Sequence, residues 1–200
     1  KLSDISARMK TFLDKEEELL ENNAVKFTSA DLETVNSRVI LLKDIYWSLK
    51  KDVLDNFDKI NELAGVDEVG ALNPSAFKKY RKINLLLNAL DRLEVRGRDS
   101  AGLQISFSLK NDDVLKKIIS ALRENNLYDD YLSRTRHGDL LHGSIYVSSE
   151  NPNKGEKKFN VSFTYKTFSI VGELGKNVCD LRKAIRSDRI LYQFAKHETI

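Results

Sequence analysis

The chain has 200 residues, which is enough for one domain with a substantial core or for two small ones. Its 33 basic and 30 acidic residues leave a net charge of only +3. This balance argues against a nucleic-acid-binding surface, where basic side chains gather on one face. The sequence shows no apolar run near the roughly 20 residues of a membrane span and no signal-peptide core at its start. We therefore expect a cytoplasmic protein with no membrane or nucleic-acid partner.

The first part of the chain has the pattern of long helices. Residues 3–21 are polar and strongly helix-forming. Ser29 and Asp31 can cap a second helix, in which apolar residues recur at steps of three and four as far as Gly65. A third amphipathic helix is predicted to begin at Pro74 or Ser75. The apolar positions of the second helix are Leu32, Val35, Val39, Leu42, Tyr46, Leu49, Val53, Ile60 and Leu63.

Three consecutive amphipathic helices joined by short breaks can bury one another, so an antiparallel bundle is expected over the first 93 residues. The alternative is a dimeric coiled coil along the seam of the second helix, which would make the protein a homodimer. In the bundle, the side chains turned inward would be Val39, Leu42, Tyr46, Leu49 and Val53.

The pattern changes after Gly97. Apolar and polar residues alternate from Ala101 to Leu109, which is the period of a half-buried strand. Residues 111–125 predict a short helix, and GSIYVSS with the later run KKFNVSFTYKTFSIVG predicts a β-hairpin. Helical spacing returns at residues 177–186, and the last apolar cluster, 190–195, is compatible with helix or strand. This order of elements predicts an α+β fold.

Isolated residues give no catalytic or metal site. His137 and His142 are five residues apart, so they miss the i, i+4 spacing of one helix face, and the glycines beside them indicate a loop. The single cysteine, Cys179, follows Val178 in a helical pattern and is predicted to be a small buried side chain. No catalytic residue, metal ligand or cofactor is therefore assigned.

One segment is harder to explain as ordinary structure. LLLNALDRLEVRGRDSAGLQI, from Leu85 to Ile105, predicts a helix, a tight corner and the start of a strand. Within it, residues 93–102 resemble the R-L-E-Y-R-G-Y-D-S-A-G segment of the glutamine:fructose-6-phosphate amidotransferases, from which they depart only at Val95 and Arg98. A weaker resemblance to the same family lies in TFSIVGELGKNVCDL, from Thr167.

The resemblance implies part of an N-terminal nucleophile hydrolase fold, in which two antiparallel sheets pack between helix layers. Residues 1–72 would be a helical insertion, and residues 73–200 would be a partial glutamine amidotransferase domain. In that family an N-terminal cysteine attacks glutamine with its own amine as base, and the ammonia converts fructose 6-phosphate to glucosamine 6-phosphate. The matched positions Arg96 and Gly97 would lie beside the nucleophile and the substrate, and Asp99 and Ser100 would support the corner.

The chain also departs from the family pattern. Position 1 is lysine, no cysteine precedes Arg96, and the family's substrate and oxyanion segments would follow Ile200. We therefore expect a fragment that is inactive by itself and whose parent binds glutamine and a sugar phosphate. The alternative is a non-enzymatic module, in which the long helices bind a partner and the corner is only an element of the fold.

Overall fold

A computed structural model describes residues 1–23, 26–66, 72–93, 99–138, 140–153, 156–168 and 173–200. The chain divides into two compact units, Lys1–Lys59 and Ile60–Ile200. The first unit is helical, and the second combines helices with a three-stranded antiparallel sheet. The predicted α+β class is therefore confirmed. The sequence analysis placed a domain boundary at residue 72 because of the amidotransferase resemblance. The division into compact units does not test that boundary.

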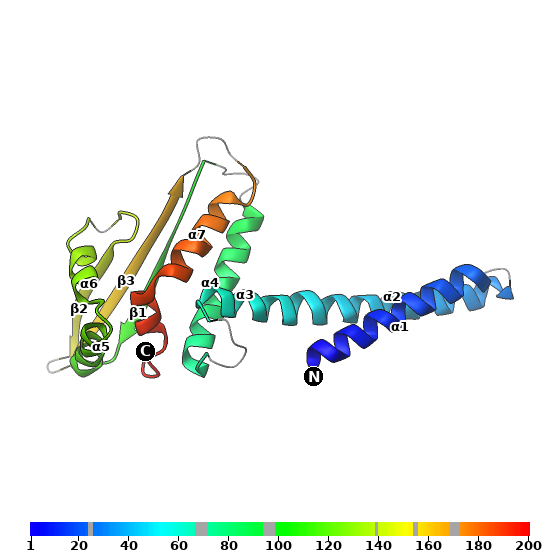
Figure 1. Ribbon diagram of the computed structural model, residues 1–200, viewed down its shortest axis with the longest axis horizontal. Coiled ribbons are helices and arrows are strands. Elements are labelled where there is room, and N and C mark those ends of the chain that lie inside the picture. Colours follow the sequence, from blue (N-terminus) through cyan, green and yellow to red (C-terminus); the bar gives the residue numbers. More distant parts are fainter. Residues whose placement is uncertain (24–25, 67–71, 94–98, 139, 154–155, 169–172) are drawn as a thin grey trace. The chain divides into compact units, whose positions relative to one another are not determined.

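The helical unit is a hairpin of α1 (Leu2–Asn23) and α2 (Ser29–Trp47), drawn in blue in Figure 1. Thr28 caps α2, because its side-chain hydroxyl accepts a hydrogen bond from the Asp31 N–H at 3.2 Å. From α2 the chain continues through a π-helix, η2 (Ser48–Leu54), into α3 (Asp55–Leu63). The long second helix predicted from the sequence is therefore present, with a wider π-helical segment inside it.

The hairpin buries only part of its apolar seam. Val39 is buried, Leu42, Tyr46 and Leu49 are half-buried, and Val53 is 45% exposed. The inward orientation was thus predicted correctly for Val39, in part for the next three, and wrongly for Val53. The physical reason is that Val53 lies in η2, where i→i+5 hydrogen bonding changes the angle between successive side chains and breaks the 3.6-residue period.

The predicted third helix of the bundle is α4 (Pro74–Leu93), which belongs to the second unit. There it packs on α7 (Lys176–Ser187) and α8 (Arg189–Ala195). The expectation of a three-helix bundle did not anticipate these partners, because both come from the other end of the chain. The last apolar cluster, which was compatible with helix or strand, is the helix α8.

The sheet consists of β1 (Ser100–Leu109), β2 (Ile145–Asn153) and β3 (Glu156–Phe168) in the order β1-β3-β2. Both neighbours run antiparallel to β3, and Ile105 and Ile145 lie opposite Phe163 from its two sides. The predicted strand and hairpin are therefore confirmed. The alternation is also as predicted, because Leu103 and Phe107 are buried and Ile105 is half-buried, while Gln104 and Ser106 are exposed.

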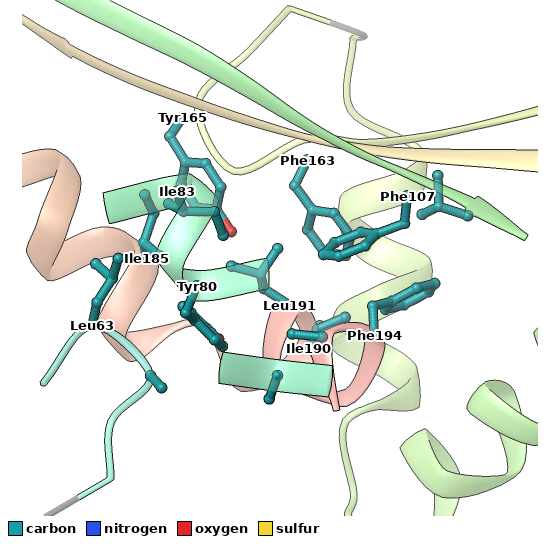
Figure 2. Packing of buried hydrophobic residues seen from close by; sticks show 14 of the residues in the cluster. Leu63, Tyr80, Ile83, Phe107, Phe163, Tyr165, Ile185, Ile190, Leu191 and Phe194 are labelled. Atoms are coloured by element: carbon teal, nitrogen blue, oxygen red, sulfur yellow. The ribbon is translucent and has the colours of Figure 1, made fainter. Parts of the chain in front are cut away.

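Helices cover the inward face of the sheet. The predicted helix α5 (Asp112–Glu124) begins at Asn111, whose side-chain oxygen accepts from the Val114 N–H. It is followed by α6 (Tyr128–Thr135), which was not predicted. At the centre of the core, the rings of Phe107, Phe163 and Phe194 lie 5.3 to 5.9 Å apart between centroids, within the range of favourable aromatic pairs (Figure 2).

The start of α4 holds the end of α8. The Lys79 ammonium donates hydrogen bonds to the carbonyls of Ala195 at 2.9 Å and His197 at 2.6 Å, and to the Ser75 hydroxyl at 2.8 Å. The amide of Asn73 donates to the Lys196 carbonyl at 2.8 Å. Carbonyls at a helix end need such donors. Partial burial lowers the pKa of Lys79.

Two leucines on α4 provide a matched test of this packing. Leu87 is fully buried, whereas Leu85 is 70% exposed. Leu87→Ala should lower the unfolding free energy of the second unit by about 2 to 5 kcal/mol, because it leaves a cavity. Leu85→Ala should change it by less than about 0.5 kcal/mol. Urea unfolding followed by the backbone amide signals of β3 would measure both, and equal effects would contradict this packing.

Candidate functional site

A helix and a strand flank the predicted corner, whose residues 94–98 lie outside the described residues. Helix α4 ends at Leu93, and β1 begins at Ser100, opposite Phe168 at the end of β3. Arg96 and Gly97, the proposed substrate-binding positions, lie outside the described residues. Asp99 and Ser100 are exposed at the open end of the sheet. The structure therefore locates Asp99 and Ser100 but tests neither their supporting role nor the substrate-binding assignment.

Hydrogen bonds tie the elements near this corner together. The Thr167 hydroxyl donates to the Asn177 side-chain oxygen at 3.1 Å, which joins the end of β3 to the start of α7. The Arg182 guanidinium donates to the side-chain oxygens of Asn84 at 2.9 Å and Asn88 at 2.7 Å, which joins α7 to α4. Burial lowers the pKa of Arg182, against the opposing charges of nearby carboxylates. These contacts hold structure in place and bring no nucleophile to the corner.

The other sequence candidates lie apart from one another. His142 accepts a hydrogen bond at Nδ1 from the Lys166 N–H at 3.0 Å and stands edge-on to Tyr165. His137 is exposed. Within the described ranges, no three His, Cys, Asp or Glu side chains are grouped closely enough to hold a metal ion.

Cys179 is exposed, so its predicted burial is wrong. The buried face of α7 consists of Asn177, Val178, Leu181 and Ile185. Cys179 is one residue beyond Val178, which turns it about 100° away from that face. The sequence argument treated a neighbour in the chain as a neighbour in the core.

The most highly connected charged residue of the described chain is Asp188, which the sequence analysis did not single out. Its carboxylate accepts two bonds from the Arg134 guanidinium, at 3.0 and 2.5 Å, and one from the Tyr165 hydroxyl at 2.6 Å. It also caps α8, accepting from the N–H groups of Ile190 and Leu191 at 3.0 Å. Arg134 donates further to the Gly143 carbonyl at 2.7 Å. We call Asp188, Arg134 and Tyr165 the Asp188 cluster.

Burial of Asp188 by itself would raise its pKa. The hydrogen bonds and positive charge of Arg134, together with the Tyr165 hydroxyl, outweigh burial, so the pKa of Asp188 is lowered. Burial and the same carboxylate raise the pKa of Tyr165 well above its usual value, which keeps its hydroxyl a donor. Several donors hydrogen-bond to the two carboxylate oxygens of Asp188. The residue is therefore suited to hold helices and strands together, and it is not suited to exchange protons. The only sequence signal that could have indicated Asp188 was its position as a capping residue directly before α8.

The Asp188 cluster predicts a dependence of stability on pH. The folded-state pKa of Asp188 lies below the unfolded value of about 3.9. Its contribution is therefore complete above about pH 4 and is lost as the pH falls through the folded-state pKa. Asp188→Asn should cost roughly 3 to 5 kcal/mol at pH 7, because Arg134 keeps a partly buried charge without its partner.

Urea unfolding of the second unit between pH 2.5 and pH 7 would measure this effect. The difference between the original protein and Asp188→Asn should shrink at the acidic end. Asp130→Asn is the matched control, because Asp130 is exposed and lies 3.9 Å from Arg134. A difference of the same size at every pH would contradict the account of the carboxylate.

The helical unit carries a second feature that calls for a functional explanation. Four large apolar side chains of α2 are presented to solvent, with exposed fractions between 49% and 62%. At 100° per residue, two of them, Leu41 and Ile45, lie opposite Val39, and the other two lie about a quarter turn from Val39, with the exposed Asp44 between the two pairs. We call this set the outward α2 face. It consists of Ile40, Leu41, Ile45 and Trp47. A helix that is apolar on both sides is normally covered on both sides, and clustered exposed apolar side chains mark interaction sites.

Polar residues of opposite sign border the outward α2 face. Stepping by three and four residues along α2 and η2, the positions are Arg38, Leu41, Ile45, Ser48 and Asp52. Ser48 and Asp52 lie on the same side, since the Ser48 hydroxyl donates to the Asp52 carboxylate at 3.0 Å. Arg38 and Asp52 are exposed. The apolar stripe thus has a cation at one end and an anion at the other, seven residues on either side of Ile45.

Comparison of the chain with protein-family models, with curated proteins and with solved structures finds no match. No helix in the described part of the chain is both long and apolar enough to cross a membrane.

Proposed function

We propose that this protein is a non-enzymatic association module, in which the outward α2 face pairs with the same face of a second copy in antiparallel orientation. The observation that carries the proposal is that Ile40, Leu41, Ile45 and Trp47 are exposed on α2, with Leu41 and Ile45 on the side opposite the buried Val39. The sequence analysis gave a non-enzymatic module as its alternative function. It placed its alternative homodimer on the seam that contains Val39, whereas the dimer proposed here uses the outward α2 face.

The energetics of the hairpin support a covered face. Leu13 of α1 and Val39 of α2 are the only apolar side chains that these two helices fully bury in the described structure. Two helices with so small a shared core gain little from packing, and most helical stability in proteins comes from tertiary packing. Burying the outward α2 face would add stabilising free energy of about 25 cal/mol per Å² of apolar surface. Trp47 also belongs to the residue types that contribute most at interfaces.

The charge pattern favours a second copy as the occupant. If two α2 helices cross antiparallel at Ile45, Arg38 of each copy lies opposite Asp52 of the other, because both are seven residues from the centre. Parallel pairing would instead place like charges together. The outward α2 face is therefore complementary to itself in the antiparallel orientation.

Dilution provides the first test of the dimer. Sedimentation equilibrium should give twice the chain mass at high concentration and the chain mass on dilution. Trp47 is the only tryptophan, so its emission should shift to shorter wavelength as the dimer forms. Leu41→Glu with Ile45→Glu should shift the dissociation constant by at least about 100-fold, since two buried apolar contacts are each worth over about 1.4 kcal/mol.

Leu140→Glu serves as the matched control, because it introduces the same change at a residue of the second unit that is 66% exposed. It should leave the dissociation constant unchanged. A monomer at every concentration, or equal effects of control and α2 variants, would contradict the proposal.

A charge exchange tests the antiparallel orientation separately. Arg38→Asp alone and Asp52→Arg alone should each weaken the dimer several-fold, because each places like charges opposite one another. The double variant Arg38→Asp with Asp52→Arg should restore most of the affinity, and both losses should shrink in high salt. Additive losses in the double variant would rule out this pairing.

The amidotransferase fragment is a second candidate, favoured by one observation: a helix ends at Leu93 and a strand begins at Ser100, on the two sides of the segment that carries the resemblance. The outward face of the sheet weighs against it. That face carries Gln104, Ser106 and Ser108 on β1, with the hydroxyl of Ser106 paired to Ser162 at 2.7 Å. A polar face of this kind does not suit the apolar interior between two packed sheets.

Glutamate release from glutamine decides the second candidate. We expect none from the purified chain, because the family's nucleophile and base belong to an N-terminal cysteine and position 1 here is lysine. Release that scales with protein concentration and disappears in Cys179→Ala would overturn this expectation. It would also assign Cys179 a catalytic role.

A further inference from the structure

A groove of about 340 Å³ runs along one edge of the second unit, between α4 and β1. It is lined by Lys79, Lys82, Ile83 and Leu86 of α4, by the five consecutive residues 104–108 of β1, and by Ile200. Both walls belong to the same compact unit, in which α4 and β1 run in opposite directions (Figure 1).

The lining of β1 shows that the groove follows the strand edge. Successive side chains of a strand point to opposite faces of its sheet, and here Ile105 and Phe107 point inward while Gln104, Ser106 and Ser108 point outward. On the edge of β1, the five residues have only their backbone atoms in common, because their side chains alternate between the two faces. A groove that touches all of them therefore runs along the edge of the strand.

That edge is open in the described structure. Strand β1 is ten residues long, stands at the end of the order β1-β3-β2, and pairs only with β3 among the described strands. Alternate backbone N–H and C=O groups of such an edge strand point away from the sheet and are available to another extended chain.

The side chains of the groove divide into two chemical parts. Leu86, which is 43% exposed, and Ile83 provide an apolar wall. Lys82 provides a cation and also lines an adjoining hollow of about 370 Å³ with Lys78 and Lys79. Lys79 already donates to Ser75, Ala195 and His197, so Lys78 and Lys82 are the cations left for a ligand. Glu198 lines the same hollow and is the acidic group that a ligand would meet there.

We infer that this groove binds an extended peptide segment of a partner protein, which adds as a further strand to the edge of β1. Main-chain hydrogen bonds to the edge would supply affinity, and alternate side chains would supply specificity. The segment would place β-branched or other apolar side chains against Ile83 and Leu86 and an acidic side chain near Lys82. This inference concerns the second unit and does not depend on the pairing of α2.

The test uses the full chain, labelled with ¹⁵N, and a panel of acetylated eight-residue peptides. In the panel, valine or isoleucine alternates with threonine, and glutamate or aspartate stands at either end. At least one peptide should bind saturably and shift the amide signals of residues 104–108 and Lys82. The same peptide with alternate backbone amides N-methylated should lose binding at least about tenfold, because it keeps the side chains but cannot complete the strand pairing.

Matched variants separate the groove from its surroundings. Lys82→Glu should weaken the binding peptide about tenfold, whereas Arg81→Glu, on the exposed neighbouring position outside the groove, should weaken it less than about twofold. Leu86→Ser should weaken it, and Leu85→Ser, at a 70% exposed position outside the groove, should not. Unchanged amide spectra outside the groove would show that each variant folds.

Three results would overturn the inference. One is the absence of binding across the panel at about 1 mM peptide. Another is equal affinity for the N-methylated peptide. The third is displacement of the peptide by a single-stranded oligonucleotide that binds Lys78 and Lys82 more tightly, which would assign the cations to nucleic acid.

Discussion

The second unit depends on a single carboxylate. Asp188 joins three elements that are far apart in the sequence: Arg134 comes from α6, Tyr165 from β3, and Asp188 itself caps α8. A buried carboxylate is costly unless hydrogen bonds and an opposite charge compensate it, and here five donors do so. Because Phe194 of α8 packs on Phe107 and Phe163, the position of α8 set by Asp188 also sets the centre of the core (Figure 2).

With its core arranged in this way, the second unit leaves the edge of β1 open, and the helical unit leaves the outward α2 face open. The two surfaces differ in the forces they offer. The outward α2 face offers apolar area with opposite charges at its ends, which suits a second helix. The β1 edge offers backbone hydrogen bonds beside an apolar wall and a lysine, which suits an extended chain. Both surfaces are suited to binding other polypeptides, which is why we propose an association module and not an enzyme.

Elements with a strong local period could be predicted from the sequence, and contacts between distant elements could not. The alternation around Leu103 and Phe107 predicted β1, and repeated apolar steps predicted α2. The short helix α6 was missed because its eight residues offer one helical step, Tyr128 to Tyr131 and Leu132, which is too short a pattern to stand out. Its Arg134 contacts Gly143 and Asp188, and the contact with Asp188 is distant in sequence. Cys179 was misplaced because adjacency in the chain is not adjacency on a helix face. For the predicted site, Asp99 and Ser100 lie at the corner, whereas Arg96 and Gly97 lie outside the described residues.

In the proposed dimer, the outward α2 face is buried against the same face of a second copy. Isotope-filtered NOE spectroscopy on a mixture of ¹³C-labelled and unlabelled chains tests it most directly, because it records only contacts between copies. The account predicts NOEs from the methyl groups of Leu41 and Ile45 to the other copy, including contacts between the two Ile45 side chains. A concentrated sample that gives no such NOEs, or gives them only from residues outside the outward α2 face, would contradict the account.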